Sequence, residues 1–427
     1  MTTLFSHATV LCMDEAGTVL QDGYVLVRGR EIAYVGPIRP QERADREVNA
    51  TGKVLMPGFV DAHTHLTMSL MRGYGGGHDL QTWLNDYIFP VEAKLDSRAV
   101  RAGTALSLAE AIADGVTSVS DMYYFCDDII AEVVKSGISA NISRSVTCFG
   151  PVDDPENYYA CRELHAFREQ WHGFDSGRIR VDASIHAEYT SFAAPNMWEY
   201  LGRYAADHKL GMQVHLSETR SEHLECMARH AGKTPFAVLD DYGVWQNGGV
   251  AAHCVWVSQD DMEGMVRRGV TAVHNPVSNL KLASGVAPVP RLLQAGVNVA
   301  LGTDGVASNN SHDLFEEIKL AALLHIMLPL NLETGRKSPL KYADTGIRET
   351  LREMERRGAK RARVTAKIAG GARMFEVAGG GNLGNIGQRN IESVHMTLRT
   401  EGVRLLQEDV GGTVARTLLF DAATGQG

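Results

Sequence analysis

The sequence lacks the features that mark secreted, membrane-spanning and nucleic-acid-binding proteins. Its six cysteines are scattered without a Cys-x-x-Cys pair, so we expect reduced thiols and no disulfide framework. No apolar run approaches the roughly 20 residues of a membrane span, and the first residues lack the basic-then-apolar order of a signal peptide. The formal net charge is -9, and the sequence contains no stripe of basic residues of the kind that binds nucleic acid. We therefore expect a cytoplasmic protein that binds neither membrane nor nucleic acid.

The composition is that of an ordinary globular protein. Of the 427 residues, 44% are hydrophobic and 22% are charged, which is enough for a large core with one or two smaller domains. Residues 1–56 contain short β-like pieces, which the turn residues Asp22-Gly23 and Gly36-Pro37 separate. This pattern predicts part of a small β-sandwich.

Residues 57–325 alternate short apolar strands with helical stretches, which is typical of βα units around a parallel sheet. Eight such units in about 270 residues predict an α/β fold of the (β/α)₈ barrel type, whose active sites lie at the carboxyl ends of the strands. The predicted strand ends fall near His65, Asp121, Val146, His186, His215, His253, His274 and Asp304.

Residues 326–427 show a different pattern, which predicts a separate α/β segment. We expect a loop over Pro329–Pro339 and a flexible turn at Gly379–Asn382. The predicted helices and strands of this segment are Asp344–Arg357, Val364–Ile368, Gln388–Thr400 and Arg404–Gln407.

Histidines and carboxylates recur at the predicted strand ends. His63 and His65 stand two apart, so a strand would turn both imidazoles to one face. His215 and Asp304 end two further strands. Three imidazoles and one carboxylate suit a single Zn²⁺ or Fe²⁺ ion and leave room for a water molecule. Each of these residues, taken alone, could simply be a hydrogen-bonded polar group or a helix cap. The same explanation would have to apply independently on several separate strands, which favours the metal site.

The same strand ends offer groups for acid–base chemistry. A bound metal lowers the pKa of a water towards ~7, and Asp304 is placed both to contact the metal and to take the proton. Glu218 follows its strand by three residues, where it can carry a proton to the substrate. The sequence leaves open whether His253 binds the metal or hydrogen-bonds the water.

Three stretches resemble known enzymes. Residues Pro57–His65 resemble the first-strand signature of the amidohydrolase superfamily. The blocks His274–Gly285 and Leu301–Asn310 are similar to the 5-methylthioadenosine/S-adenosylhomocysteine deaminases and their chlorohydrolase relatives. The resemblance covers about residues 1–325.

This resemblance implies roles for individual residues. It implies one divalent metal, zinc or alternatively iron, bound by His63, His65, His215 and Asp304, with His253 beside the water and Glu218 as the proton shuttle. It further implies that Glu92 binds the ribose hydroxyls of a nucleoside and that Arg144 and His186, together with Glu218 and Asp304, contact the substrate. The implied reaction is attack of metal-activated hydroxide on C6 of an adenine ring, with release of ammonia. The stretch Ser184–Thr190 departs from the usual His-Ala-Pro-Tyr or His-Ser-Pro-Tyr form, which leaves the exact substrate open.

The last hundred or so residues resemble a second family, the chemoreceptor glutamine deamidase CheD. The blocks that carry this resemblance are His325–Pro329, Lys341–Thr345, Ala366–Phe375, Ile386–Asn390 and Glu408–Gly412. That family uses a cysteine nucleophile upstream of a histidine, and here the upstream sequence is the barrel without such a cysteine. We therefore expect neither deamidase activity nor chemoreceptor binding from this tail.

Two alternatives stay open at this point. The chain is also compatible with another hydrolase on the same scaffold, acting on guanine, a pterin or a triazine. It is compatible with a non-enzymatic fusion remnant or a chemotaxis interaction module that uses only the tail. The sequence is compatible with a homo-oligomer as well as with a monomer.

Overall fold

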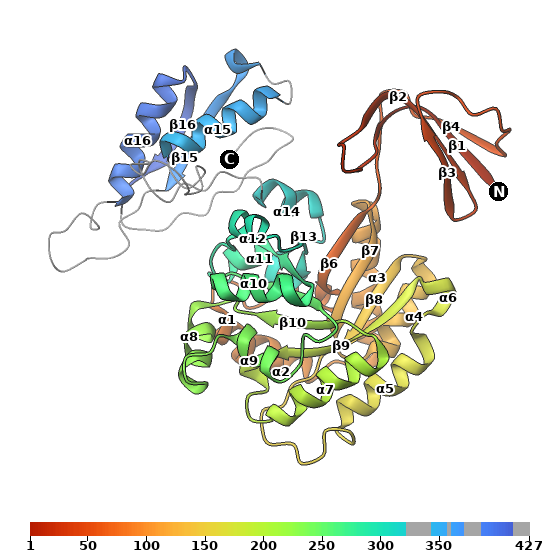
Figure 1. Cartoon of the computed structure of the whole chain (residues 1–427), viewed down its shortest axis with the longest axis vertical. Helices are drawn as coiled ribbons and strands as arrows, with labels where there is room; N and C mark the ends of the chain where they lie inside the picture. The colour runs from red at the N-terminus through yellow and green to blue at the C-terminus, as the bar shows by residue number, and fades with distance from the viewer. Residues whose placement is uncertain (322–342, 357–359, 371–385, 413–427) are drawn as a thin grey trace. The chain divides into compact units, whose positions relative to one another are not determined.

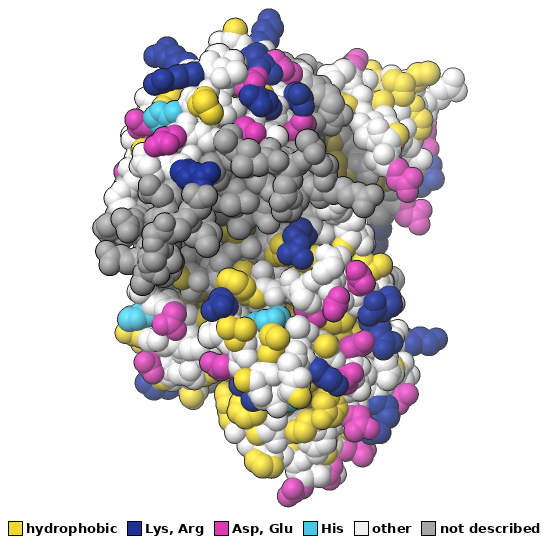
Figure 2. Space-filling model, turned by 60° about the vertical axis from the view of Figure 1, so that its left-hand side comes forward, with side chains coloured by type: hydrophobic (Ala, Val, Ile, Leu, Met, Phe, Trp, Pro, Cys, Tyr) yellow, Lys and Arg dark blue, Asp and Glu magenta, His cyan; other side chains and the backbone are white. Residues whose placement is uncertain are grey.

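The computed structural model describes residues 1–321, 343–356, 360–370 and 386–412 (Figure 1). The chain divides into two compact units, Met1–Leu320 and Ala321–Gly427. Among the described residues, no helix is long and apolar enough to cross a membrane. On the face shown in Figure 2, the described basic and acidic side chains are interspersed and do not gather by sign.

The first unit begins with a five-stranded sheet in the order β3-β2-β1-β4, with β5 pairing β1. The strands are β1 (Thr2–Leu11), β2 (Val19–Arg28), β3 (Glu31–Gly36), β4 (Arg46–Asn49) and β5 (Val54–Leu55). Small apolar clusters such as Ala8, Val10 and Val25 pack on this sheet. The described residues thus provide one sheet of the predicted sandwich, and no second sheet facing it is found among them.

One turn prediction in this sheet is wrong. Asp22 and Gly23 do not separate two strands but lie inside β2, where the register with β1 shifts between Ala8 and Val10. A β-carbon on Gly23 would lie 2.6 Å from a methyl group of Val10, so the glycine permits close approach of two strands at a bulge. The chain reverses earlier, at Gly17 with a φ of +63°.

A closed parallel barrel forms the rest of the first unit. The sheet order is β13-β12-β11-β10-β9-β8-β7-β6-β14, and β14 pairs in parallel with β6. The last two strands follow each other directly and act as the two halves of an eighth strand. The barrel strands are β6 (Phe59–His65), β7 (Val116–Tyr123), β8 (Ser139–Arg144), β9 (Ile179–Ala187), β10 (Met212–Leu216), β11 (Gly249–His253), β12 (Val270–His274), β13 (Val299–Leu301) and β14 (Asp304–Gly305).

The predicted (β/α)₈ barrel is therefore confirmed, and every predicted strand end lies within two residues of the observed one. Helices cover the outside of the sheet (Figure 1). They are α3 (Ser97–Ala113), α4 (Cys126–Ser136), α5 (Tyr159–Trp171), α6 (Phe174–Gly177), α7 (Pro195–His208), α8 (Arg220–Arg229), α9 (Pro235–Asp241), α10 (Gln259–Arg268), α11 (Pro276–Lys281), α12 (Val289–Ala295), α13 (Val306–Asn309) and α14 (Leu314–Ala321).

The connection between β6 and α3 is long and partly helical. It contains the 3₁₀ helix η1 (Leu66–Met71), α1 (Leu80–Thr82), the π-helical turn η2 (Trp83–Ile88) and α2 (Phe89–Glu92). Asp79 caps α1 by accepting hydrogen bonds from the next backbone N–H groups. Trp83, Leu84 and Ile88 are buried, so this connection carries apolar side chains that line the site.

The second unit has its own small core. Its described elements are α15 (Ala343–Arg356), η5 (Arg361–Arg363), β15 (Thr365–Gly370), α16 (Ile386–Thr400) and β16 (Arg404–Val410). β15 and β16 pair in parallel, and such a pair requires a crossover, which contains α16. The two helices and the two strands lie within three residues of where the sequence predicts them, and η5 was not predicted. The predicted loop at 329–339 and the turn at 379–382 fall outside the described residues.

Candidate metal centre and active-site pocket

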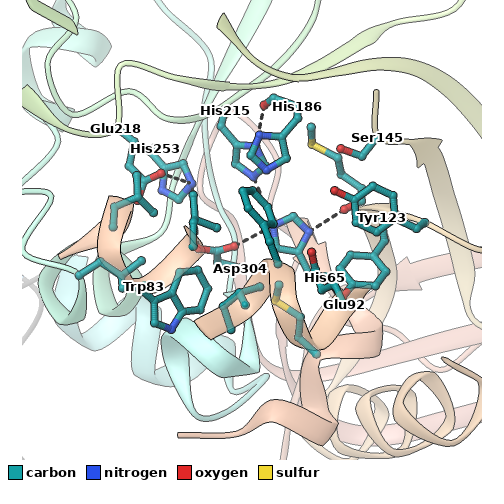
Figure 3. Close-up of a pocket in the computed structure, with 18 of the residues that line it drawn as sticks. His65, Trp83, Glu92, Tyr123, Ser145, His186, His215, Glu218, His253 and Asp304 are labelled. Atoms are coloured by element: carbon teal, nitrogen blue, oxygen red, sulfur yellow. Dashed lines mark hydrogen bonds and ion pairs between the residues drawn. The ribbon is translucent and has the colours of Figure 1, made fainter. Parts of the chain in front are cut away.

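Five predicted side chains converge at the carboxyl ends of the barrel strands. His63, His215, His253 and Asp304 each place one ligand atom so that the four atoms lie within 4.8 Å of one another. His65 joins them, because its Nε2 lies 3.2 Å from Nε2 of His215 and 3.1 Å from Oδ1 of Asp304. The five side chains come from β6, β10, β11 and β14, so the barrel brings them together. Figure 3 shows four of them, His65, His215, His253 and Asp304.

Hydrogen bonds to the outer ring nitrogens orient three of the imidazoles. Nδ1 of His65 lies 2.6 Å from the carbonyl oxygen of Met122, and Nδ1 of His215 lies 2.7 Å from that of His186. Nδ1 of His253 lies 2.8 Å from Oδ1 of Asn279. Because these oxygens only accept hydrogen bonds, each Nδ1 carries a proton, and each Nε2 is the nitrogen that faces the cluster and can bind a metal. This is the arrangement of metal-binding histidines.

His63 shows that the cluster fits a metal ion. Its side chain is 1% exposed, and its Nε2 has no hydrogen-bond partner among the described residues. A buried ring nitrogen without a partner is costly, and a cation in the centre of the cluster would satisfy it. Imidazole nitrogens with one carboxylate oxygen are a typical donor set for zinc and related divalent metals.

The protonation states also suit a cation. Burial lowers the pKa of His63 to about 4 and that of His215 well below its usual value, so both rings are neutral ligands near pH 7. Burial would also lower the pKa of His65, but its bond with Asp304 outweighs this and raises the value to about 9. A cation at this place would displace that proton, as metal binding to histidine does.

Asp304 is held so that one carboxylate oxygen faces the imidazoles. Oδ2 accepts hydrogen bonds from Oγ of Ser278 at 2.6 Å and Oγ of Ser308 at 3.1 Å, while Oδ1 faces the β6 histidines. Burial would raise the pKa of Asp304, but the neighbouring imidazoles of His63 and His65 outweigh it and hold the pKa well below its usual range. Its φ of +61° is left-handed, a conformation that aspartate tolerates better than most residues and that often accompanies functional sites.

Glu218 lies next to this cluster in a dry environment. Its Oε1 accepts a hydrogen bond from Oγ of Ser284 at 3.0 Å, and its Oε2 lies 3.5 Å from Nε2 of His253. Burial raises the pKa of Glu218, so this carboxyl group holds a proton more readily than an exposed glutamate. A group with these properties is suited to general acid–base catalysis.

The turn that carries Glu218 is fixed by a residue that the sequence analysis missed. Glu222 accepts the backbone N–H groups of Ser217, Glu218 and Thr219 at 3.0, 2.9 and 3.2 Å. The signal was present as a capping box, in which Thr219 precedes a glutamate by three residues at the start of α8.

A cavity opens beside the cluster. Its inner end is polar, with the histidines, Glu218 and Asp304, and the remaining wall is mainly apolar and aromatic (Figure 3). Residues of this wall that the sequence analysis did not single out include Leu80, Trp83, Leu84, Ile88, Phe89, Met122, Tyr123, Tyr124, Ser145, Tyr189 and Leu282. Those from Leu80 to Phe89 belong to a run of apolar and aromatic residues after the first strand, which was their sequence signal, while the others lie at or just after the ends of other elements.

The predicted substrate contacts divide into two groups. Glu92 and His186 line the cavity. Oε1 of Glu92 accepts a hydrogen bond from the Tyr123 hydroxyl at 2.6 Å, and burial raises the pKa of Glu92 to about 7. Arg144 is not among the described lining residues, because its Nε donates to Oε2 of Glu163 at 2.6 Å. The roles of all three residues stay predictions.

The stretch that departs from the usual family form contains a buried ion pair. Glu188, between His186 and Tyr189, has a fully buried side chain. Its carboxylate lies 2.6 Å from Nη2 of Arg229 and 2.9 Å from Nε2 of His230, both at the end of α8. The pair therefore connects the end of β9 with the helix that follows Glu218.

We expect the substitution Arg229→Met to lower the free energy of unfolding by roughly 3–5 kcal/mol, because it leaves the Glu188 carboxylate buried without its cation. Denaturant unfolding followed by circular dichroism measures this loss. Glu225→Gln is the matched control, since that exposed carboxylate is 3.7 Å from Arg229 and should contribute under about 1 kcal/mol. A loss for Arg229→Met as small as that of the control would contradict the prediction.

With this geometry established, comparison with known proteins identifies the class. The sequence model of the amidohydrolase family matches residues 54–358, and the chain belongs to this family. A model of the family described as CheD chemotactic sensory transduction matches residues 327–427. Both predicted resemblances are thus confirmed.

Several characterised proteins resemble the chain individually. It is 38% identical over 325 residues to a 5-methylthioadenosine/S-adenosylhomocysteine deaminase of Thermoanaerobacter pseudethanolicus, covering 76% of this chain and 74% of that protein. It is 41% identical to a 5'-deoxyadenosine deaminase of Methanothermobacter thermautotrophicus, covering 75% and 73%. The crystal structure of a zinc-bound adenosine deaminase from Xanthomonas campestris superimposes with a TM-score of 0.70 at 33% identity, covering 75% and 73%.

Proposed function

We propose that this protein is a metal-dependent hydrolytic deaminase of adenine nucleosides such as 5-methylthioadenosine, S-adenosylhomocysteine and adenosine. The observation that carries the proposal is the convergence of the histidine–Asp304 cluster with the acid Glu218 at the inner end of one cavity. The relatives named as adenine nucleoside deaminases support the same assignment. The other amidohydrolase reactions stay alternatives. The similarity to a guanine deaminase structure, at 24% identity, concerns the fold alone and does not favour guanine as the substrate.

His63, His65, His215 and Asp304 are the proposed ligands of one divalent ion, and zinc is the proposed metal. The convergent imidazole nitrogens and the partnerless Nε2 of His63 support this ligand set, and the zinc-bound relative supports the choice of metal. When bound, the ion supplies a Lewis acid that brings the pKa of a water near ~7.

The chain's own residues then move the protons. Glu218 gives its proton to a ring nitrogen of adenine, which makes C6 more electrophilic; its raised pKa suits it to hold that proton. Asp304, which is ionised, accepts a proton from the attacking water and passes it to the departing amino group. His253, with Nδ1 bonded to Asn279, points Nε2 towards Glu218 and Asp304 and orients the water. A C–O bond forms at C6, the C–N bond breaks, and ammonia leaves with the first water proton. The second water proton passes from the C6 hydroxyl to Glu218, which leaves a C6 carbonyl and restores the acid.

The remaining wall supports nucleoside binding. Glu92 offers a carboxylate to the ribose hydroxyls, and the Tyr123 hydroxyl orients it. Trp83, Phe89 and Tyr124 offer aromatic surface to a planar base.

The test is a substrate panel on the full chain loaded with Zn²⁺ and, in parallel, with Fe²⁺. We expect ammonia release and the ultraviolet change from adenine to hypoxanthine with adenosine and 5-methylthioadenosine, and no turnover of guanine, a pterin or a triazine. Inactivity of both metal forms on every adenine nucleoside would overturn the proposal. Turnover of guanine, the pterin or the triazine alone would establish the corresponding alternative.

A further inference from the structure

The cavity wall has a marked imbalance of charge. Apart from tyrosines, its titratable side chains are acids and histidines, with Glu92 on one side and Glu218 and Asp304 at the inner end (Figure 3). No lysine or arginine is among the described residues that line it. An anionic group on a ligand would therefore find no lysine or arginine in this wall to pair with, which disfavours its binding.

A cation does lie one side chain behind this wall. Arg144 ends β8, its side chain is only 6% exposed, and its Cζ lies 5.1 Å from the centre of the Tyr124 ring. Its guanidinium also donates to the carbonyl oxygen of Ser145. Tyr124 and Ser145 both line the cavity, so only these residues separate the charge of Arg144 from a ligand.

The charge of Arg144 is already neutralised from the outside. Oε2 of Glu163, on α5, accepts a hydrogen bond from Nε of Arg144 at 2.6 Å, and the Glu163 side chain is 56% exposed. A buried guanidinium needs an anionic partner. In this chain Glu163 on α5 is that partner. Arg144 therefore has no need of an anionic group from a ligand in the cavity.

We propose that Glu163 is a specificity-determining residue, which makes the cavity select adenine nucleosides whose 5′ substituent is uncharged. This inference rests on the proposed function and narrows its substrate class. Two nucleosides test it well, because 5-methylthioadenosine and S-adenosylhomocysteine share adenosine and a thioether at the 5′ carbon. The first ends in a methyl group and the second in an amino acid with a carboxylate.

The experiment compares kcat/KM for the two nucleosides in the zinc-loaded full chain. We expect the wild type to prefer 5-methylthioadenosine by at least about tenfold. In Glu163→Gln the freed Arg144 can pair with the carboxylate, so the ratio of S-adenosylhomocysteine to 5-methylthioadenosine should rise about tenfold. Glu163→Ala should move the ratio in the same direction. Glu169→Gln is the matched control, because Glu169 lies on the same helix 3.8 Å from Arg168, and its ratio should equal that of the wild type.

The outcomes separate this inference from the proposed function. If the wild type deaminates both nucleosides equally well, or if both Glu163 variants keep the wild-type ratio, the inference is wrong and the proposed function stands. If the wild type deaminates no adenine nucleoside, the proposed function fails and the inference fails with it. A melting temperature for each variant, measured by circular dichroism, shows whether a change in rate reflects folding, and the ratio is independent of the fraction of active enzyme.

Discussion

The variant His65→Ala is expected to lose its bound metal and to deaminate adenosine at least on the order of 10³-fold more slowly in kcat/KM, since a metal ion contributes several kcal/mol of transition-state stabilisation. The side chain is central to the cluster, because Nε2 of His65 lies within 3.2 Å of both His215 and Asp304. Alanine removes a ligand and also leaves the buried carboxylate of Asp304 with one partner fewer.

Metal content per chain, measured by atomic emission after dialysis, and the deamination rate test this prediction together. His208→Ala is a suitable control, because His208 is an exposed residue at the end of α7 and lies outside the cluster. We expect it to keep both metal and rate. If His65→Ala retained one metal per chain and a rate within tenfold of the wild type, the proposed ligand set would be wrong.

A second variant, Glu218→Gln, should separate proton transfer from metal binding. Glutamine has the same shape and can keep the hydrogen bond with Oγ of Ser284, but it cannot give a proton to the substrate. Because a positioned acid or base contributes roughly 10²–10⁴-fold, we expect kcat to fall by about that factor. Metal content should stay at the wild-type level, since Glu218 is not in the proposed ligand set.

The same variant also allows a prediction about stability. Burial raises the pKa of Glu218, so the folded protein disfavours its ionised form above the unfolded pKa. Replacing the group with a neutral amide removes this penalty, and Glu218→Gln should be at least as stable as the wild type at pH 8. Thermal melting checks this. A fall in kcat of less than threefold, with metal intact, would show that another group transfers the proton.

Much of the site could be predicted from local patterns because barrel strands impose regular geometry. His63 and His65 share one face because side chains alternate along β6. His215, His253 and Asp304 lie at strand ends, and the parallel sheet brings such ends to one rim. The chemistry of the cluster therefore follows from short stretches of sequence and from the fold class that their repetition predicts.

Local sequence patterns did not predict the features that depend on contacts between residues distant in the chain. Asp22-Gly23 has the composition of a turn, but the neighbouring Val10 makes it a bulge inside β2. The Met122 carbonyl on β7 and the Asn279 side chain on α11, which orient His65 and His253, come from other elements than the histidines that they bind. A hydrogen bond between distant residues leaves no periodicity along the chain.

The sequence by itself predicts a metal-binding barrel, because the βα alternation, the spacing of His63 and His65 and the residues at the strand ends are properties of the primary sequence; the resemblance of Pro57–His65 adds the amidohydrolase type. The composition of the cavity wall, in contrast, depends on the tertiary structure. It combines the apolar connection after β6 with residues of other strand ends, and it places Arg144 beside Glu163, 19 residues further along the chain. The choice of substrate depends on that pairing, since whether a charged side chain is free or neutralised depends on its neighbours in space.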